Sequence, residues 1–96
     1  MKKAYWVCIF EKIDNTEKLK KYAIKAKPAI EKFNGKFLAR GGKSRTNEGI
    51  ESPRVVVVEF PDYETAKECY DSKEYQEAHS ILEGHVVRHH QIVEGY

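Results

Sequence analysis

The sequence predicts an α+β protein of the ferredoxin-like class, with the order β-α-β-β-α-β and one four-stranded antiparallel sheet. Two strongly apolar segments are each followed by a helical pattern, and a polar loop beginning with two glycines separates the two halves. The 96 residues suffice for one domain, so we expect residues 1–96 to form a single ferredoxin-like unit. The right-handed crossover rule places the first and third strands at the centre and both helices on one face.

The first half of the chain predicts a strand and then a helix. Residues 4–10 (AYWVCIF) form the strand. Asp14, with Glu17 three residues later, is the expected N-cap of the helix. Pro28 should kink or break this helix, because proline lacks the N–H and clashes with the preceding turn. Gly35 is suited to the left-handed position that ends it.

The second half repeats this pattern. Asp62 is the expected cap of a second helix, and Ser72 that of a separate short helix that follows. A polar loop over residues 43–53 is longer than most hairpin connections. The remaining strands are predicted at residues 36–40, 54–60 and 85–94.

The first strand is apolar on both of its faces, which two helices on one side cannot cover. Its alternating sets are Tyr5, Val7 and Ile9 on one face and Trp6, Cys8 and Phe10 on the other. Each large apolar side chain left exposed forgoes roughly 1.5–3 kcal/mol of burial. We therefore expect a homodimer in which a second copy covers the open sheet face.

Composition excludes several classes of partner. The formal net charge is +2, with 17 basic and 15 acidic residues intermixed, and the lysines between positions 18 and 27 lie on a helix with apolar residues between them. This pattern indicates a solvated helix face rather than a nucleic-acid surface. No apolar run is long enough for a bilayer. Cys8 and Cys69 have no metal-like spacing, so we expect buried, reduced thiols and a cytoplasmic protein.

Several segments together resemble domain-of-unknown-function family 1330. They are residues 37–42 (FLARGG), 54–61 (RVVVVEFP), Ala66, Tyr70, Ser72, 74–76 (EYQ) and 93–95 (VEG). The resemblance implies a dimeric α/β barrel, in which two ferredoxin-like sheets face each other, and no established common activity. Relatives in the wider group include cofactor-free monooxygenases, muconolactone-type isomerases and haem-handling enzymes. Cys69 and Leu82 depart from the family pattern, which often has tryptophan and arginine there, so a shared substrate does not follow.

Four residues are candidates for a ligand site, and none has an assigned catalytic role. Glu59 ends the valine run, where it is either solvated at the strand end or acts as a general base or ligand anchor. Arg40 precedes two glycines, where it either binds an anion or forms an ion pair with Glu59 or Glu94. Tyr70 and His79 lie on the predicted helices that cover the same sheet.

No metal or cofactor is expected from the sequence. His89 and His90 are adjacent on a strand and therefore point to opposite faces, so they cannot easily chelate one metal together, and a metal site would require helix and strand histidines to converge. No serine or cysteine lies in a recognisable nucleophile motif. Two functions remain open: a homodimeric protein that binds a small organic molecule, and a cofactor-independent monooxygenase or isomerase acting on a small organic acid or aromatic.

Overall fold

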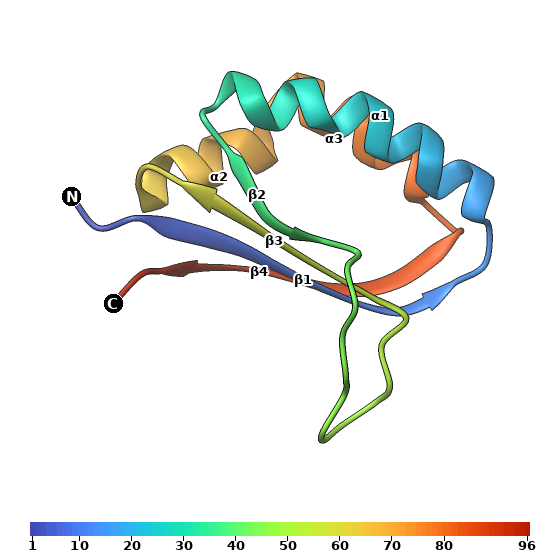
Figure 1. The fold of residues 1–96 in the computed structure, drawn as a ribbon. Coiled ribbons are helices and arrows are strands. Elements are labelled where there is room, and N and C mark those ends of the chain that lie inside the picture. The colour runs from blue at the N-terminus through green and yellow to red at the C-terminus, as the bar shows by residue number, and fades with distance from the viewer.

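The computed structural model describes residues 1–96 and has the predicted order of elements. Its strands are β1 (Ala4–Ile13), β2 (Lys36–Arg40), β3 (Arg54–Phe60) and β4 (Val86–Glu94). Its helices are α1 (Thr16–Lys32), α2 (Tyr63–Asp71), α3 (Lys73–His79) and the short 3-10 helix η1 (Ser80–Leu82). The antiparallel sheet has the order β2-β3-β1-β4, and the helices all lie on one face (Figure 1). The predicted fold class is therefore confirmed.

Helix α1 begins one residue later than predicted. Its N-cap is Asn15, whose Oδ1 accepts a hydrogen bond from the Lys18 backbone N–H at 3.0 Å. The prediction of Asp14 as the cap is wrong because Asp14 still belongs to the sheet end: its backbone N–H donates to the His85 carbonyl at 2.8 Å. Its carboxylate instead pairs with Lys12 at 3.4 Å.

Pro28 does not divide α1, which continues without a break to Lys32. The predicted break is therefore absent. The carbonyl that loses its helical partner is that of Ile24, an exposed residue, so water can hydrate it.

The end of α1 also differs from the prediction in one residue. Asn34, not Gly35, takes the left-handed conformation, with φ of 62°. Gly35 N–H donates to the Ile30 carbonyl and Asn34 N–H to the Glu31 carbonyl, both at 2.9 Å, which is a Schellman ending. Gly35 is required for another reason: a Cβ there would lie 2.4 Å from Ile30 Cγ2 and 2.9 Å from Phe60 Cε1.

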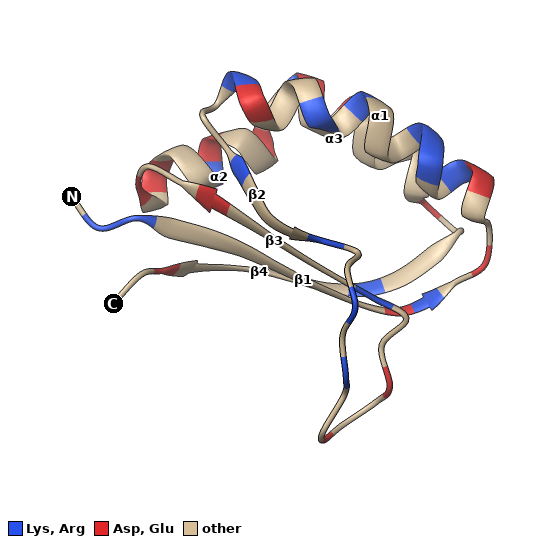
Figure 2. Cartoon of the chain, in the orientation of Figure 1, with Lys and Arg blue, Asp and Glu red and all other residues tan.

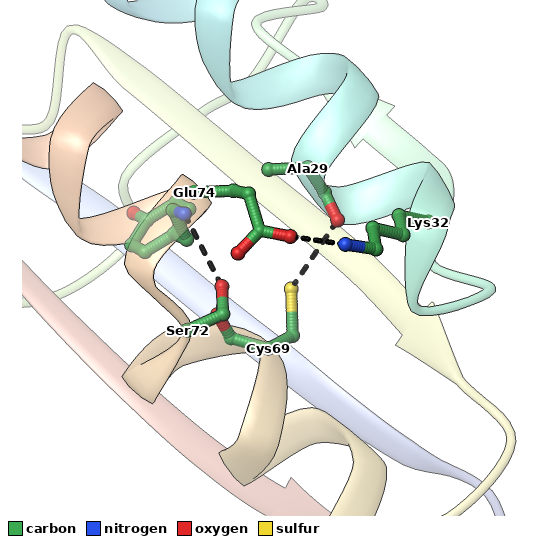
Figure 3. Close-up of polar contacts among 6 residues, drawn as sticks. Ala29, Lys32, Cys69, Ser72 and Glu74 are labelled. Carbon is green, nitrogen blue, oxygen red and sulfur yellow. Dashed lines mark hydrogen bonds and ion pairs between the residues drawn. The ribbon is translucent and has the colours of Figure 1, made fainter.

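The caps of the two later helices are confirmed. Asp62 accepts from the Thr65 N–H at 2.8 Å, and the Ser72 hydroxyl accepts from the Tyr75 N–H at 3.2 Å. Figure 3 shows how this region meets α1: Lys32 forms an ion pair with Glu74, and the Cys69 thiol lies 3.9 Å from the Ala29 carbonyl oxygen. The helices therefore form a connected layer over the sheet.

The register assigns each strand residue to one of two faces. The helix-covered face carries the core, which includes Trp6, Phe10, Val58 and Phe60, each at most 2% exposed. The opposite face, which we call the open face, has no helix over it (Figure 1). Its apolar residues are Tyr5, Val7, Ile9, Val55, Val57, Val87 and Val93. The predicted apolar character of both faces of β1 is therefore present.

Basic and acidic residues both occur along the helices, the strands and the loop between β2 and β3 (Figure 2). The α1 lysines at positions 20, 21, 25 and 27 are exposed to solvent. Acidic residues are interspersed with the lysines along the helices, as expected for a solvated surface. None of the helices has the length and apolar composition needed to cross a lipid bilayer.

Candidate functional site

A partly open pocket lies between α1 and the helix-covered face of the sheet. Ten of its 14 lining residues are hydrophobic, and its cavity measures about 30 Å³. The polar lining residues include Arg40, Arg54, Arg88 and His90. A mostly apolar concavity with a few convergent polar groups is the usual form of a small-molecule site.

Strand pairing determines which side chains meet in this pocket. Arg40, Val56, Cys8 and His90 form one row across the four strands, and Arg54, Phe10 and Arg88 form the next. A register shift between Phe37 and Ala39 allows both Phe37 and Arg40 to face the pocket from the edge strand β2. The sheet thus brings three arginines to one apolar site.

None of the pocket arginines has a carboxylate partner. All five salt bridges in the structure are made by lysines. Arg40 donates to the Ala23 backbone carbonyl at 3.2 Å, which connects the edge of the sheet to α1 at the rim of the pocket. The Nε of Arg54 is buried and has no hydrogen-bond acceptor. The guanidinium stays charged at all physiological pH values, so the pocket is positively charged.

Arg88 belongs to a polar network on the inner wall. It donates to the Tyr75 hydroxyl at 2.9 Å and to the Tyr22 hydroxyl at 3.5 Å, and these hydroxyls lie 2.7 Å apart. Its third contact is the Cys8 sulfur at 3.2 Å. Burial raises the pKa of the Cys8 thiol and outweighs the opposing effect of the Arg88 charge. Cys8 is therefore a protonated thiol at neutral pH and a poor nucleophile.

His90 forms the other polar part of the wall. Its ring lies between Trp6 and Tyr70, with centroid distances of 4.8 and 5.0 Å. Burial, and secondarily the Arg88 charge, lowers the pKa of His90 to about 4. Its Nε2 atom is buried without a hydrogen-bond partner. The pocket therefore contains a neutral imidazole at physiological pH.

The four residues predicted from the sequence do not meet in one place. Arg40 lies at the pocket rim, whereas Glu59 lies on the open face, where it binds Lys3 at 3.2 Å and the Tyr5 hydroxyl at 3.3 Å. Neither of the ion pairs suggested for Arg40 is present. A single cleft containing Arg40 and Glu59 is excluded within one chain, because the two side chains are on opposite faces of the sheet.

The other two predicted residues lie close together behind the pocket. The rings of Tyr70 and His79 are 6.2 Å apart, and Tyr70 also contacts His90. Burial lowers the pKa of His79. Neither residue lines the cavity that the arginines surround. A ligand-binding role for Tyr70 or His79 stays a prediction.

Sequence reasoning missed Arg54, Arg88 and His90 as site residues. The signal that could have identified Arg54 is its alternation with Val56 and Val58, which places all three on the same face of β3. Arg88 and His90 are also two residues apart and share one face of β4. On that strand, however, both alternating sets mix polar and aliphatic residues, so the sequence does not indicate which set faces the helices. The adjacent histidines do point to opposite faces, as predicted, with His90 opposite Cys8 and His89 opposite Ile9.

Comparison with known proteins supports the fold and supplies a family. The profile of the family described as "Domain of unknown function (DUF1330)" matches residues 3–96. No curated protein sequence matches this chain.

Solved structures with this fold have low sequence identity to the chain. A protein of unknown function from Rhodopseudomonas palustris has a TM-score of 0.79 at 15% identity, covering 99% of this chain and 83% of that one. SnoaB, a cofactor-independent oxygenase from Streptomyces nogalater, has a TM-score of 0.71 at 10% identity, covering 100% and 95%. A dimeric ferredoxin-like protein of unknown function from Thermobifida fusca has a TM-score of 0.60 at 11% identity, covering 98% and 92%. At these identities the likeness establishes the fold alone.

Proposed function

We propose that this chain, which belongs to the DUF1330 family, binds a small organic carboxylate in the pocket between α1 and the sheet. One observation carries the proposal: three of the four arginines line one apolar pocket, and no carboxylate of the chain pairs with any of them. Partly buried positive charge without a partner is costly, and a ligand anion removes that cost. Guanidinium groups match the planar geometry of a carboxylate.

The lining of the pocket favours a carboxylate with an apolar body over inorganic phosphate. Trp6, Phe10 and Phe37 supply aromatic surface between the arginines. Phosphate would pair with the guanidiniums and leave that surface without a partner. An aromatic or short aliphatic acid satisfies both the charge and the apolar wall.

The cavity of about 30 Å³ holds only a water molecule or two, so a ligand must widen it. Arg40 is the side chain suited to move. It is exposed, and its hydrogen bond to the Ala23 carbonyl, at 3.2 Å, is the only one that its side chain makes. Binding would exchange this bond for a charge-assisted bond to the carboxylate, which is the stronger of the two.

Isothermal titration with benzoate and benzamide tests the charge requirement, because the two ligands share a ring and differ in charge. We expect benzoate to bind and benzamide to bind at least tenfold more weakly, as loss of a charge-assisted hydrogen bond costs about 1.5–3 kcal/mol. Arg54→Gln should reduce the preference for benzoate, with Arg40 and Arg88 still in the pocket. Arg45→Gln is the matched control, since Arg45 is exposed in the loop and does not line the pocket.

Three results would contradict this function. Equal affinity for benzoate and benzamide would show that the arginines do not distinguish a charged ligand from a neutral one. Unchanged benzoate binding in Arg54→Gln would place the ligand elsewhere. If inorganic phosphate binds more tightly than benzoate and displaces it, the pocket is a phosphate site.

We also propose that the protein is a homodimer formed through the open face. What supports this is the apolar stripe of that face, on which Ile9, Val87 and Val93 are 39%, 49% and 47% exposed in the single chain. Exposed apolar surface of this extent is typical of an interface. Two of the structural neighbours are themselves described as dimeric.

A second candidate function is a cofactor-independent enzyme of monooxygenase or isomerase type. The specific observation in its favour is His90, a neutral imidazole in an apolar pocket beside the proposed carboxylate site. The neutral imidazole has a lone pair with which it can hydrogen-bond a reacting group of a bound aromatic acid. Oxygen uptake in the presence of bound aromatic acids, measured for the wild type and for His90→Phe, distinguishes this function from binding alone.

We propose a cytoplasmic location on the basis of the two cysteines. Cys8 and Cys69 are both buried, and neither is in a disulfide. Cys8 is on β1. Cys69 is on α2, and its thiol lies against the Ala29 carbonyl of α1. Free buried thiols are typical of proteins in a reducing compartment.

A further inference from the structure

Two buried side-chain atoms have no hydrogen-bond partner in this structure, Arg54 Nε and His90 Nε2. Both belong to residues that line the same pocket. Most buried polar atoms in proteins are paired, so each exception requires an explanation. The two atoms also differ in what they require: a guanidinium N–H only donates, whereas an imidazole nitrogen donates or accepts according to its tautomer. A ligand that satisfies both atoms in either tautomer of His90 therefore carries an acceptor for Arg54 and, for His90, a group that can donate or accept.

None of the polar groups around His90 forms a hydrogen bond with its Nε2 atom. The guanidinium of Arg88 is on the same face of β4, but it donates to Tyr22, Tyr75 and the Cys8 sulfur. The tyrosine hydroxyls bond to each other. Trp6 donates its indole N–H to the Ala66 carbonyl at 3.0 Å. His90 is thus the free polar group of the inner pocket.

A hydroxyl is the ligand group that suits His90 best. The imidazole is neutral at physiological pH, because burial lowers its pKa to about 4. If Nε2 carries the proton, a hydroxyl oxygen accepts it; if Nε2 carries the lone pair, the hydroxyl donates to it. A methyl group or hydrogen in the same place leaves Nε2 unpaired in either tautomer.

The spacing of the two atoms suits one molecule that carries both groups. Arg54 is on β3 and His90 on β4, with β1 between them and an offset of two residues along the strands, so their backbones are roughly 12 Å apart. Both side chains project from the helix-covered face of the sheet and line the pocket. Phe10 and Trp6 of β1 supply the apolar surface between them.

We propose that the pocket selects hydroxy acids, with the carboxylate paired to Arg54 and a hydroxyl hydrogen-bonded to His90 Nε2. This inference rests on the proposed carboxylate-binding function and names its ligand class. His90 is then a specificity-determining residue, because sites built to hydrogen-bond a hydroxyl discriminate strongly against ligands that lack it.

The test compares 2-, 3- and 4-hydroxybenzoate with the three methylbenzoates by isothermal titration, since a methyl group is close in size to a hydroxyl. In the wild type, at least one hydroxybenzoate should bind roughly tenfold to a hundredfold more tightly than its methyl counterpart. His90→Phe keeps a ring between Trp6 and Tyr70 and should reduce this ratio to about one. His89→Phe is the matched control, because His89 is on the opposite face of the sheet from the pocket, and it should keep the wild-type ratio.

The outcomes separate this inference from the proposed function. If all six benzoates bind with equal affinity and in an Arg54-dependent manner, the hydroxyl selection is wrong and the carboxylate function stands. If no benzoate binds, both are overturned. Because the ligand comparison is made on the wild type, it decides the question even if His90→Phe does not fold.

Discussion

The buried imidazole of His90 makes the stability of the fold depend on pH in a direction that follows from its surroundings. In the unfolded chain its pKa has the ordinary value of 6.5, and in the folded protein burial lowers it to about 4. At pH 7.5 the imidazole is neutral in both states, so its protonation contributes nothing to the free energy of unfolding. As the pH falls below 6.5, His90 binds a proton in the unfolded chain but not in the folded chain. The free energy of unfolding therefore decreases until the pH reaches about 4.

The size of this effect follows from the two pKa values of His90. A pKa of 6.5 in the unfolded chain and of about 4 in the folded chain lowers the free energy of unfolding by about 3 kcal/mol at low pH. About 2 kcal/mol of this is already lost at pH 5. His90→Phe cannot titrate. Between pH 7.5 and 5, the wild type should therefore lose about 2 kcal/mol more unfolding free energy than this variant.

Urea unfolding at both pH values measures this, with the fluorescence of Trp6, the single tryptophan, as the signal. The protein concentration must be constant, because association would contribute to stability. His79 also has a lowered pKa, but it is present in both proteins, so its effect cancels in the difference. An equal pH-dependent loss in the wild type and in His90→Phe would refute the reasoning that His90 is held neutral by burial.

Three further predictions concern packing, assembly and redox state. Gly35→Ala should destabilise the fold by about 1–3 kcal/mol in urea unfolding, because its Cβ would overlap Ile30 and Phe60, whereas Gly42→Ala, with no atom within 4 Å, should change stability by less than about 0.5 kcal/mol. Val57→Lys on the open face should convert a dimer to a monomer in sedimentation at low micromolar concentration, and a wild type that sediments as a monomer would remove the dimer proposal. Thiol titration of the denatured, unreduced protein should find two thiols per chain, and a lower number would mean that the buried cysteines are oxidised.

The strands and their order could be predicted because they depend on local patterns and on a general rule of handedness. The valine run of β3 and the caps Asp62 and Ser72 are short-range signals, and the structure contains them at the predicted positions. The errors in α1 are also local. Asp14 and Asn15 are both good caps, and the hydrogen bond of Asp14 to the His85 carbonyl, just before β4, decides between them.

The site could not be predicted because it depends on which way each strand faces. Both alternating sets of β1 are apolar, so the sequence does not say whether Trp6 or Tyr5 points to the helices. That choice also determines whether Arg54 or Glu59 of β3 points into the pocket. Only the pairing of all four strands settles it, and this pairing separates Glu59 from Arg40 and brings Arg54 and His90 into the same pocket.

The Schellman ending of α1 has a consequence for the chemical ageing of the protein. Asn-Gly is the dipeptide most prone to deamidation, a reaction in which the glycine nitrogen attacks the asparagine side-chain carbonyl to form a cyclic imide. Here the Gly35 N–H donates to the Ile30 carbonyl, and Ile30 and Phe60 pack closely around the glycine. The Gly35 nitrogen is therefore not free to approach the Asn34 side chain. Deamidation at Asn34 thus requires this end of the helix to open, and its rate, followed by mass spectrometry, would record how often that opening occurs.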